Sequence, residues 1–371
     1  MPFDSEGIDD SIALCMSGGG YRAALYHVGS IMRLNEVGLL KQIGRISSVS
    51  GGSITSGVLA TRWPSLVFDA AGICTNLNEQ FTLPIRSFCS NTLDGWAIAK
   101  GAVSPFRTAA DYVMESYRDN LGLGVPLKSL TDEGPRFVFN STNLMTGSTF
   151  RFSKKYCGDY RLGLINTSPF DVATAVGCSS AFPPVLSPVE LKVDPTLFER
   201  TVGADLFDKV SFKENLSLAD GGVYDNLGLE TAWKRCRTVL VSDAGKPFSM
   251  DDSVAHLWPT QLTRVMDIAL NQALALRKRV LVADFEAGDR KGCYWGINTP
   301  MHRYPVADPI PVSDEWVTKL SGIRTRLDSF SEDEQCRLIN WGYASCDASL
   351  RSFVVPPTPP GSSPYPTFSI R

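Results

Sequence analysis

Three short glycine-rich turns carry the groups in this sequence that are best suited to acyl chemistry. The first is the glycine run at 18–20, which follows a short apolar segment and precedes a stretch with helical spacing. Glycines allow backbone amides to face outward, and the N-terminus of a helix adds partial positive charge. Such a turn can bind a phosphate or stabilise an oxyanion. The candidate residues are Gly18, Gly19 and Gly20.

The same glycines satisfy the loose dinucleotide-binding pattern GxGxxG/A, with Ala23 in the last place. That motif also requires an acidic residue at the end of the next strand. The acid at the right distance, Glu36, falls inside the first predicted helix, and the next predicted strand runs into Ser50. The dinucleotide-binding interpretation therefore fails, because the acidic residue that the motif requires is not at the end of the next predicted strand.

The second turn holds a serine between a predicted strand and a predicted helix. Ser50 is followed two places later by Gly52, which is the arrangement of a nucleophile elbow. Small neighbours are needed there because the serine backbone is strained and the strand and helix approach closely. The usual GxSxG motif begins with glycine, whereas Ser48 occupies that place here. The alternative is an ordinary helix start with Ser50 as its N-cap.

The third turn is Asp220-Gly221-Gly222, which follows a short predicted strand. An aspartate before glycine often bonds its own backbone in a turn, and this is the structural alternative for Asp220. The functional alternative is a general base at the end of a strand.

The elements around these turns alternate between strand and helix, which is typical of an α/β sheet. We predict strands over 12–16, 46–49, 217–219, 238–241 and 280–285, a hairpin over 136–152, and helices over 21–40, 54–63, 171–181, 260–279 and 331–350. Each glycine turn follows a strand, and α/β sheets place their sites where strands end.

The composition excludes several classes of protein. The 371 residues include 36 basic and 39 acidic side chains, so no bulk cationic field favours nucleic acid. Nine cysteines without a CxxC pair indicate reduced thiols, and the acidic N-terminus does not resemble a Sec signal. No run of eighteen apolar residues predicts a transmembrane helix. We expect a cytoplasmic protein, with no metal because no zinc-type cluster or EF-hand loop occurs.

Taken together, the turns resemble those of the patatin-like phospholipase family, in the family's order along the chain. The resemblance rests on the segments 17–22, 49–52, 143–147, 178–184 and 220–222, and it spans residues 12 to about 245. It implies a patatin-like three-layer α/β/α fold with a central mostly parallel sheet and a helical insertion. We expect one domain over 1–350, a cap or insertion at 64–135, and an extended or disordered proline-rich tail at 351–371.

By this resemblance Ser50 is the nucleophile, Asp220 its direct partner in a Ser-Asp dyad, and the amides around the glycine run form the oxyanion hole. The family uses no catalytic histidine, which fits a chain whose histidines are His27, His256 and His302. Arg22 has two alternative roles: it binds a lipid phosphate, or it braces the loop through an ion pair with an acidic side chain.

The resemblance implies a serine lipid acyl hydrolase that needs no cofactor, cleaves carboxylic esters of phospholipids or other lipids, and works peripherally at membranes. The type is phospholipase A or lysophospholipase. Two alternatives are a catalytically weak lipid-binding scaffold, favoured by Ser48, and a nucleotide-activated effector of anti-phage defence. We expect the enzyme to stay inactive until it meets a membrane, a small molecule or a partner. The aromatic stretch 68–106 either covers the site or packs in the ordinary core. The oligomeric state stays open.

Overall fold

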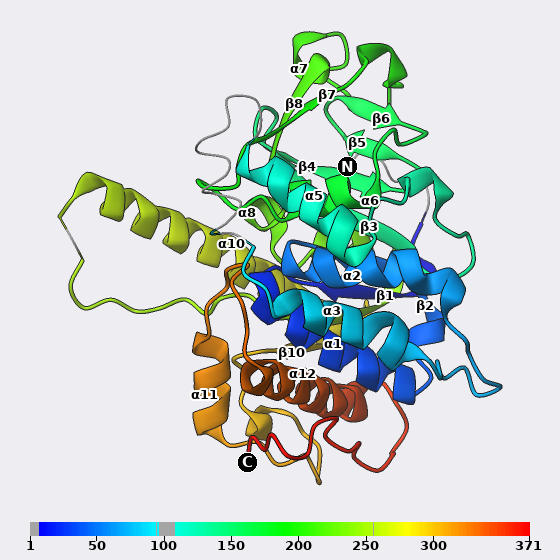
Figure 1. Ribbon diagram of the computed structural model, residues 1–371, viewed down its shortest axis with the longest axis vertical. Helices are drawn as coiled ribbons and strands as arrows, with labels where there is room; N and C mark the ends of the chain where they lie inside the picture. The colour runs from blue at the N-terminus through cyan, green and yellow to red at the C-terminus, as the bar shows by residue number, and fades with distance from the viewer. Residues whose placement is uncertain (1–6, 94, 96–107, 255) are drawn as a thin grey trace.

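The computed structural model describes residues 7–93, 95, 108–254 and 256–371 and shows a ten-stranded mixed sheet between helices (Figure 1). Its centre is parallel, in the order β10-β9-β1-β2-β3, which confirms the predicted central parallel sheet. These strands are β1 (Asp9–Met16), β2 (Ile43–Ser48), β3 (Arg136–Asn143), β9 (Cys236–Asp243) and β10 (Lys291–Gly296).

An antiparallel extension continues the sheet beyond β3, and it includes the strand that leads into the Asp-Gly-Gly turn. It comprises β4 (Ser148–Ser153), β5 (Cys157–Asp159), β6 (Gly163–Ile165), β7 (Val189–Lys192) and β8 (Asn215–Asp220). Strands β3 and β4 form the predicted hairpin, and β8 also pairs with β3, with Ser141 opposite Asp220. The extension therefore brings the third turn beside the parallel centre.

Helices cover both faces of the sheet. One face packs on α1 (Gly20–Glu36), α2 (Gly51–Arg62), α3 (Leu83–Cys89), α5 (Ala109–Leu121), α6 (Val172–Ser179), α11 (Asp314–Gly322) and α12 (Glu332–Phe353). A smaller apolar cluster on the other face involves the segment of α8 (Gly222–Asp225) and α9 (Leu229–Trp233) together with α10 (Trp258–Ala287). Helix α7 (Ser211–Glu214) lies at the antiparallel end. The predicted three-layer α/β/α architecture is confirmed.

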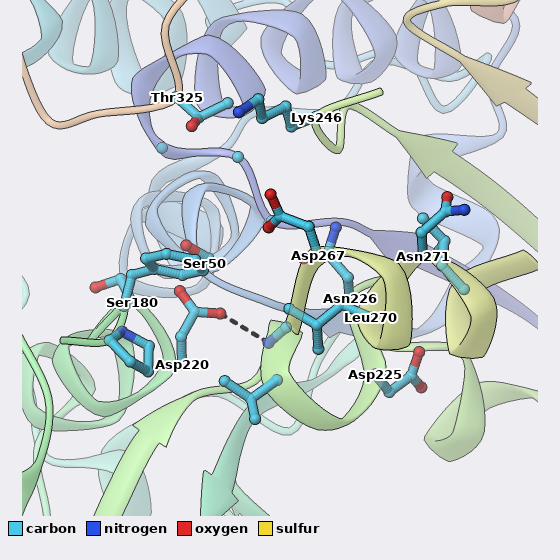
Figure 2. A pocket seen from close by; sticks show the side chains of 18 of the residues that line it. Ser50, Ser180, Asp220, Asp225, Asn226, Lys246, Asp267, Leu270, Asn271 and Thr325 are labelled. Carbon is cyan, nitrogen blue, oxygen red and sulfur yellow. Dashed lines mark hydrogen bonds between the residues drawn. The ribbon is translucent and has the colours of Figure 1, made fainter. Parts of the chain in front are cut away.

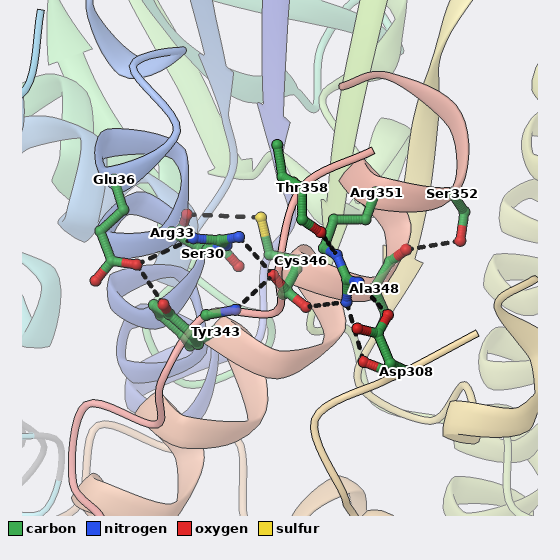
Figure 3. Close-up of polar contacts among 12 residues, drawn as sticks. Ser30, Arg33, Glu36, Asp308, Tyr343, Cys346, Ala348, Arg351, Ser352 and Thr358 are labelled. Carbon is green, nitrogen blue, oxygen red and sulfur yellow. Dashed lines mark hydrogen bonds and ion pairs between the residues drawn. The ribbon is translucent and has the colours of Figure 1, made fainter. Parts of the chain in front are cut away.

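Helices α1 and α12 pack closely and are joined by buried charges. An added Cβ at Gly342 would lie 1.8 Å from the carbonyl oxygen of Tyr26, so only glycine permits this approach. Figure 3 shows the polar network beside it, in which Arg33 Nη2 of α1 lies 2.7 Å from Asp347 Oδ1 of α12. The rigid α1–α12 pair supports the glycine turn from which α1 begins.

The proline-rich tail lies against the body as irregular chain. The amide of Gly361 donates to Asp347 at 3.2 Å, and the Asn340 side chain donates to the carbonyls of Tyr365 and Phe368 at 2.8 and 3.0 Å. These contacts join the tail after α12 to the body.

The predicted strand over 280–285 is wrong, because helix α10 continues to Ala287 and ends at Gly288 with a φ of 79°. A short apolar run does not by itself distinguish a strand from a helix. Leu274, Leu281 and Phe285, spaced at helical intervals, pack toward β9 and its neighbours. The strand of this region is β10, which the sequence analysis missed.

Among the described residues, no helix combines the length and the apolar character that crossing a membrane requires.

Candidate active site

Ser50 occupies a sharp turn between β2 and α2. Its φ of 51° and ψ of −119° make it the one non-glycine residue with positive φ among those described. Such a conformation costs on the order of 1–3 kcal/mol and persists where surrounding structure imposes it. The Ser50 hydroxyl makes no capping hydrogen bond, so the N-cap alternative has no support. This geometry is that of a nucleophile elbow.

The neighbours of Ser50 show why the elbow needs small residues. An added Cβ at Gly51 would lie 2.1 Å from the Gly20 carbonyl oxygen, and one at Gly52 would lie 2.4 Å from that of Met16. Ser48, which replaces the usual glycine, is fully buried, and its hydroxyl accepts a hydrogen bond from Ser53 Oγ at 3.0 Å. The serine is therefore accommodated without breaking the turn.

Asp220 lies at the end of β8 and is almost completely buried. Its Oδ1 accepts a hydrogen bond from the Gly222 amide at 2.7 Å, while Oδ2 has no hydrogen-bond partner. Burial raises the pKa of Asp220 to about 6, and the Gly222 amide and the nearby Ser50 hydroxyl act in the opposite direction. A carboxylate with a free oxygen and this pKa suits proton transfer near neutral pH.

Ser50 and Asp220 line one pocket, together with the glycine run 18–20 (Figure 2). The cavity measures about 570 Å³. A volume of this size can bury a substantial part of a small ligand. Residues that are 170 positions apart in sequence are thus brought into one site by the pairing of β8 with β3.

The glycine turn presents two available amides. The Gly18 amide donates to the Asn226 carbonyl at 3.1 Å, which removes one of the three predicted oxyanion donors. In the described part of the chain, the amides of Gly19 and Gly20 donate to no protein acceptor. Helix α1 begins at Gly20, so its positive end reinforces these amides.

Arg22 lies outside the pocket and is fully buried. Its Nη1 donates to the carbonyls of Ser321 and Ile323 at 2.7 and 2.8 Å, and its Nη2 donates to that of Ala244 at 2.9 Å. Burial lowers the pKa of Arg22 to about 10. These contacts favour the bracing alternative, with carbonyls in place of the expected acid, and leave no exposed donor for a lipid phosphate.

None of the three histidines lines the pocket as the structure describes it. His27 is fully buried, with its ring nitrogens near Ser242 Oγ at 2.8 Å and the Ser17 carbonyl at 2.9 Å. Burial lowers the pKa of His27 to about 4, which is the behaviour of a neutral structural ring. His256 and His302 are exposed.

The sequence analysis missed the remaining walls of the pocket. They come from the segments 180–186 and 325–327, from the loop after β9 and from α10, and include Phe182, Lys246, Phe248, Asp267 and Leu270. The helical spacing within α10 was visible in the sequence, but its position over the pocket depends on long-range packing.

The described part of the aromatic stretch 68–106 favours the core-packing alternative over the cover. Phe81 and Phe88 are buried in the core, as the packing alternative predicts, whereas Trp96 and Phe106 lie outside the described residues.

Where the chain is described, no group of three or more histidine, cysteine or acidic side chains is arranged to hold a metal ion.

Comparison with known proteins identifies the family and the fold. A family model described as patatin-like phospholipase matches residues 14–233. Human GIVD cytosolic phospholipase A2 is similar in structure, with a TM-score of 0.50 and 13% identity, over 91% of this chain and 60% of that chain. Its complex with methyl gamma-linolenyl fluorophosphonate gives a TM-score of 0.53 and 14% identity, over 91% and 57%.

At these identities the likeness concerns the fold. This chain spans about 60% or less of the two solved chains. No curated protein sequence matches it.

Proposed function

The chain belongs to the patatin-like phospholipase family, whose model matches more than half of its residues, and from that premise we propose that it is a serine lipid acyl hydrolase. Its substrates are carboxylic esters of phospholipids or related lipids. The reaction is of the phospholipase A or lysophospholipase type and uses a Ser-Asp dyad formed by Ser50 and Asp220.

One observation carries the proposal. A serine held in a strained elbow shares its pocket with a buried carboxylate that has a free oxygen. Neither feature is needed for folding alone, since strain at Ser50 and an unpaired Asp220 oxygen both cost stability. Strain and perturbed pKa values concentrate at functional sites.

The mechanism follows from the positions of the groups. Asp220 accepts the proton of Ser50 as the serine oxygen attacks the ester carbonyl. The amides of Gly19 and Gly20 donate to the oxyanion, and each such donor contributes roughly 3–4 kcal/mol in well-studied enzymes. The tetrahedral intermediate collapses, the alcohol leaves with a proton, and an acyl-serine remains.

Water then completes the cycle. Asp220 takes a proton from the water molecule that attacks the acyl-serine. As the second intermediate collapses, Asp220 returns this proton to the Ser50 oxygen and the fatty acid leaves. No step requires a cofactor.

We place the enzyme in the cytoplasm, peripherally attached to membranes when it acts. All nine cysteines are free and buried, which supports a reducing compartment. The accommodated Ser48 gives little reason to prefer a weak scaffold. No observation on the described residues favours a nucleotide-activated effector, so we do not propose it.

Hydrolysis of a lipid panel and labelling by a fluorophosphonate test the proposal. Ser50→Ala should abolish both while the protein remains folded. Ser56→Ala is the matched control, because Ser56 is buried in the same helix and its hydroxyl has no hydrogen-bond partner there. Persistent activity or labelling in folded Ser50→Ala would refute the assignment.

A further inference from the structure

The N-terminal half of α10 extends from the body (Figure 1) and carries exposed apolar side chains. Exposed fractions between 46% and 75% are found for Leu257, Trp258, Leu262, Val265, Met266 and Ile268. Single exposed apolar residues are ordinary, whereas a contiguous group of this kind indicates an interaction surface. We call these six residues the arm surface.

The arm surface is broad. At about 100° per residue, its five helical members cover roughly 160° of the circumference of α10. Gln261 lies within this arc, and the polar residues Thr263, Arg264 and Asp267 occupy the other side. A seam for another helix is a narrower stripe, whereas a helix that lies in a membrane interface presents a wide apolar face. The breadth favours lipid over a second helix.

Helix α10 carries both the arm surface and part of the pocket lining, on opposite sides. The opposite side of α10 lines the pocket through Asp267, Leu270 and Asn271, near Ser50 and Asp220 (Figure 2). Exposed apolar side chains from two other segments, Phe182 at 59%, Val185 at 53% and Phe248 at 39%, line the same pocket. Exposed apolar side chains thus border the pocket that α10 also lines.

Charge indicates the type of lipid. Residues 246–270 contain two basic and three acidic side chains, a net charge of 2 − 3 = −1. This balance gives no attraction to anionic headgroups. Trp258, at the tip of the helix, has the amphipathic ring that favours the headgroup region.

The C-terminal half of α10 is anchored beside the site. Lys278 Nζ lies 2.5 Å from Asp243, and Arg277 Nε lies 3.4 Å from Asp225, both buried carboxylates. The base of the helix is thus tied to the ends of β9 and α8 beside the pocket, whereas in its N-terminal half Arg264 Nη1 donates to the Ser249 carbonyl at 2.7 Å.

We propose that the arm surface and the apolar pocket rim dock on zwitterionic phospholipid bilayers and deliver lipid esters to Ser50. This proposal rests on the proposed function, of which it specifies the partner and the surface. The occupant is the bilayer rather than a second copy of the chain.

Sedimentation of the full chain with phosphatidylcholine vesicles tests docking without catalysis. In a Ser50→Ala background, the protein should bind, and the triple change Trp258→Gln, Leu262→Gln and Val265→Gln should lower the partition coefficient at least about ten-fold. The matched control is Leu197→Gln, Val202→Gln and Val210→Gln, three exposed apolar residues that do not line the pocket, and it should bind normally.

A second pair of measurements separates docking from catalysis. With Ser50 intact, the arm triple should lose hydrolysis of vesicles by a similar factor and keep that of a monomeric short-chain ester, since its three residues line no part of the pocket. A wild type inactive on the short-chain ester would contradict the proposed function, while the vesicle-binding result would still decide the docking proposal.

Three outcomes would overturn the docking proposal: absence of binding by the parent protein, equal binding by the arm triple, or equal loss in the control triple. Sedimentation velocity completes the test. A parent dimer that the arm triple converts to a monomer would assign the surface to a second copy and likewise overturn the proposal.

Discussion

At the scale of single residues, the ionisation of Asp220 controls the proposed chemistry. Burial raises its pKa from 3.8 to about 6, and a general base works only when deprotonated. We therefore expect kcat/KM to fall about ten-fold per pH unit below pH 6 and to level off above it, in a pH–rate profile on a soluble ester.

The fall in kcat/KM at acid pH should not arise from unfolding caused by the protonation of Asp220. Its folded pKa is higher than its unfolded pKa, so protonation between pH 4 and 6 favours the folded state. Asp220→Asn should cost several orders of magnitude and remove this limb. A limb that disappears instead in folded His27→Asn would indicate a catalytic histidine.

Gly19 is the second residue whose chemistry can be tested directly. It has a φ of 145°, and an added Cβ would lie 2.7 Å from the Ala244 carbonyl oxygen, so Gly19→Ala should displace the amide that donates to the oxyanion. We expect kcat to fall about 100-fold with a smaller change in KM, as measured by steady-state kinetics.

Gly147→Ala is the control for Gly19→Ala. Gly147 also has a positive φ, 66°, but its surroundings are open and it does not line the pocket. The kcat and KM of Gly147→Ala should stay within about two-fold of the parent values. An unchanged kcat in folded Gly19→Ala would leave the turn as a simple helix start.

At the scale of elements, the close contact of α1 with α12 supports the glycine turn. Gly342→Ala would place a Cβ 1.8 Å from the Tyr26 carbonyl oxygen, and the two helices would have to separate. We expect the free energy of unfolding to fall by about 3 kcal/mol in urea titrations. Gly322→Ala, where no atom lies within 4 Å, should change it little; equal effects would argue against close packing as the cause.

At the scale of the whole molecule, Asp347 joins α1, α12 and the C-terminal tail. It is fully buried, and it contacts Arg33 at 2.7 Å, Arg351 at 3.3 Å and the Gly361 amide at 3.2 Å. Asp347→Ala would remove the buried acid from Arg33 and Arg351, which then keep only Glu36 and Asp308 as acidic partners among the described residues, at a cost of about 3 kcal/mol. Thermal unfolding and limited proteolysis of the tail should both report the loss.

The control for this change is Asp333→Ala in the same helix. Asp333 is half exposed and pairs with Arg337 four residues away, an arrangement worth less than about 1 kcal/mol. If Asp347→Ala behaved like this control, the network would not join the tail to the body.

The sequence by itself determined the local features of the site. The glycines beside Ser50 and Asp220 could be located because a strand end, a tight turn and a helix start leave a pattern within a few neighbouring residues. The strand–helix order around them predicted the α/β class for the same reason, and the structure has these turns in one pocket.

Only the tertiary structure decided the features that depend on distant partners. Arg22 looked suited to a phosphate until residues 300 positions away were seen to enclose it, and one of three glycine amides proved to be bonded to Asn226. Residues 280–285 are helical because α10 packs one side on the sheet, a choice that a short apolar run leaves open. Burial and partners arise from contacts between remote segments, so they determine which groups remain available for chemistry and for the membrane.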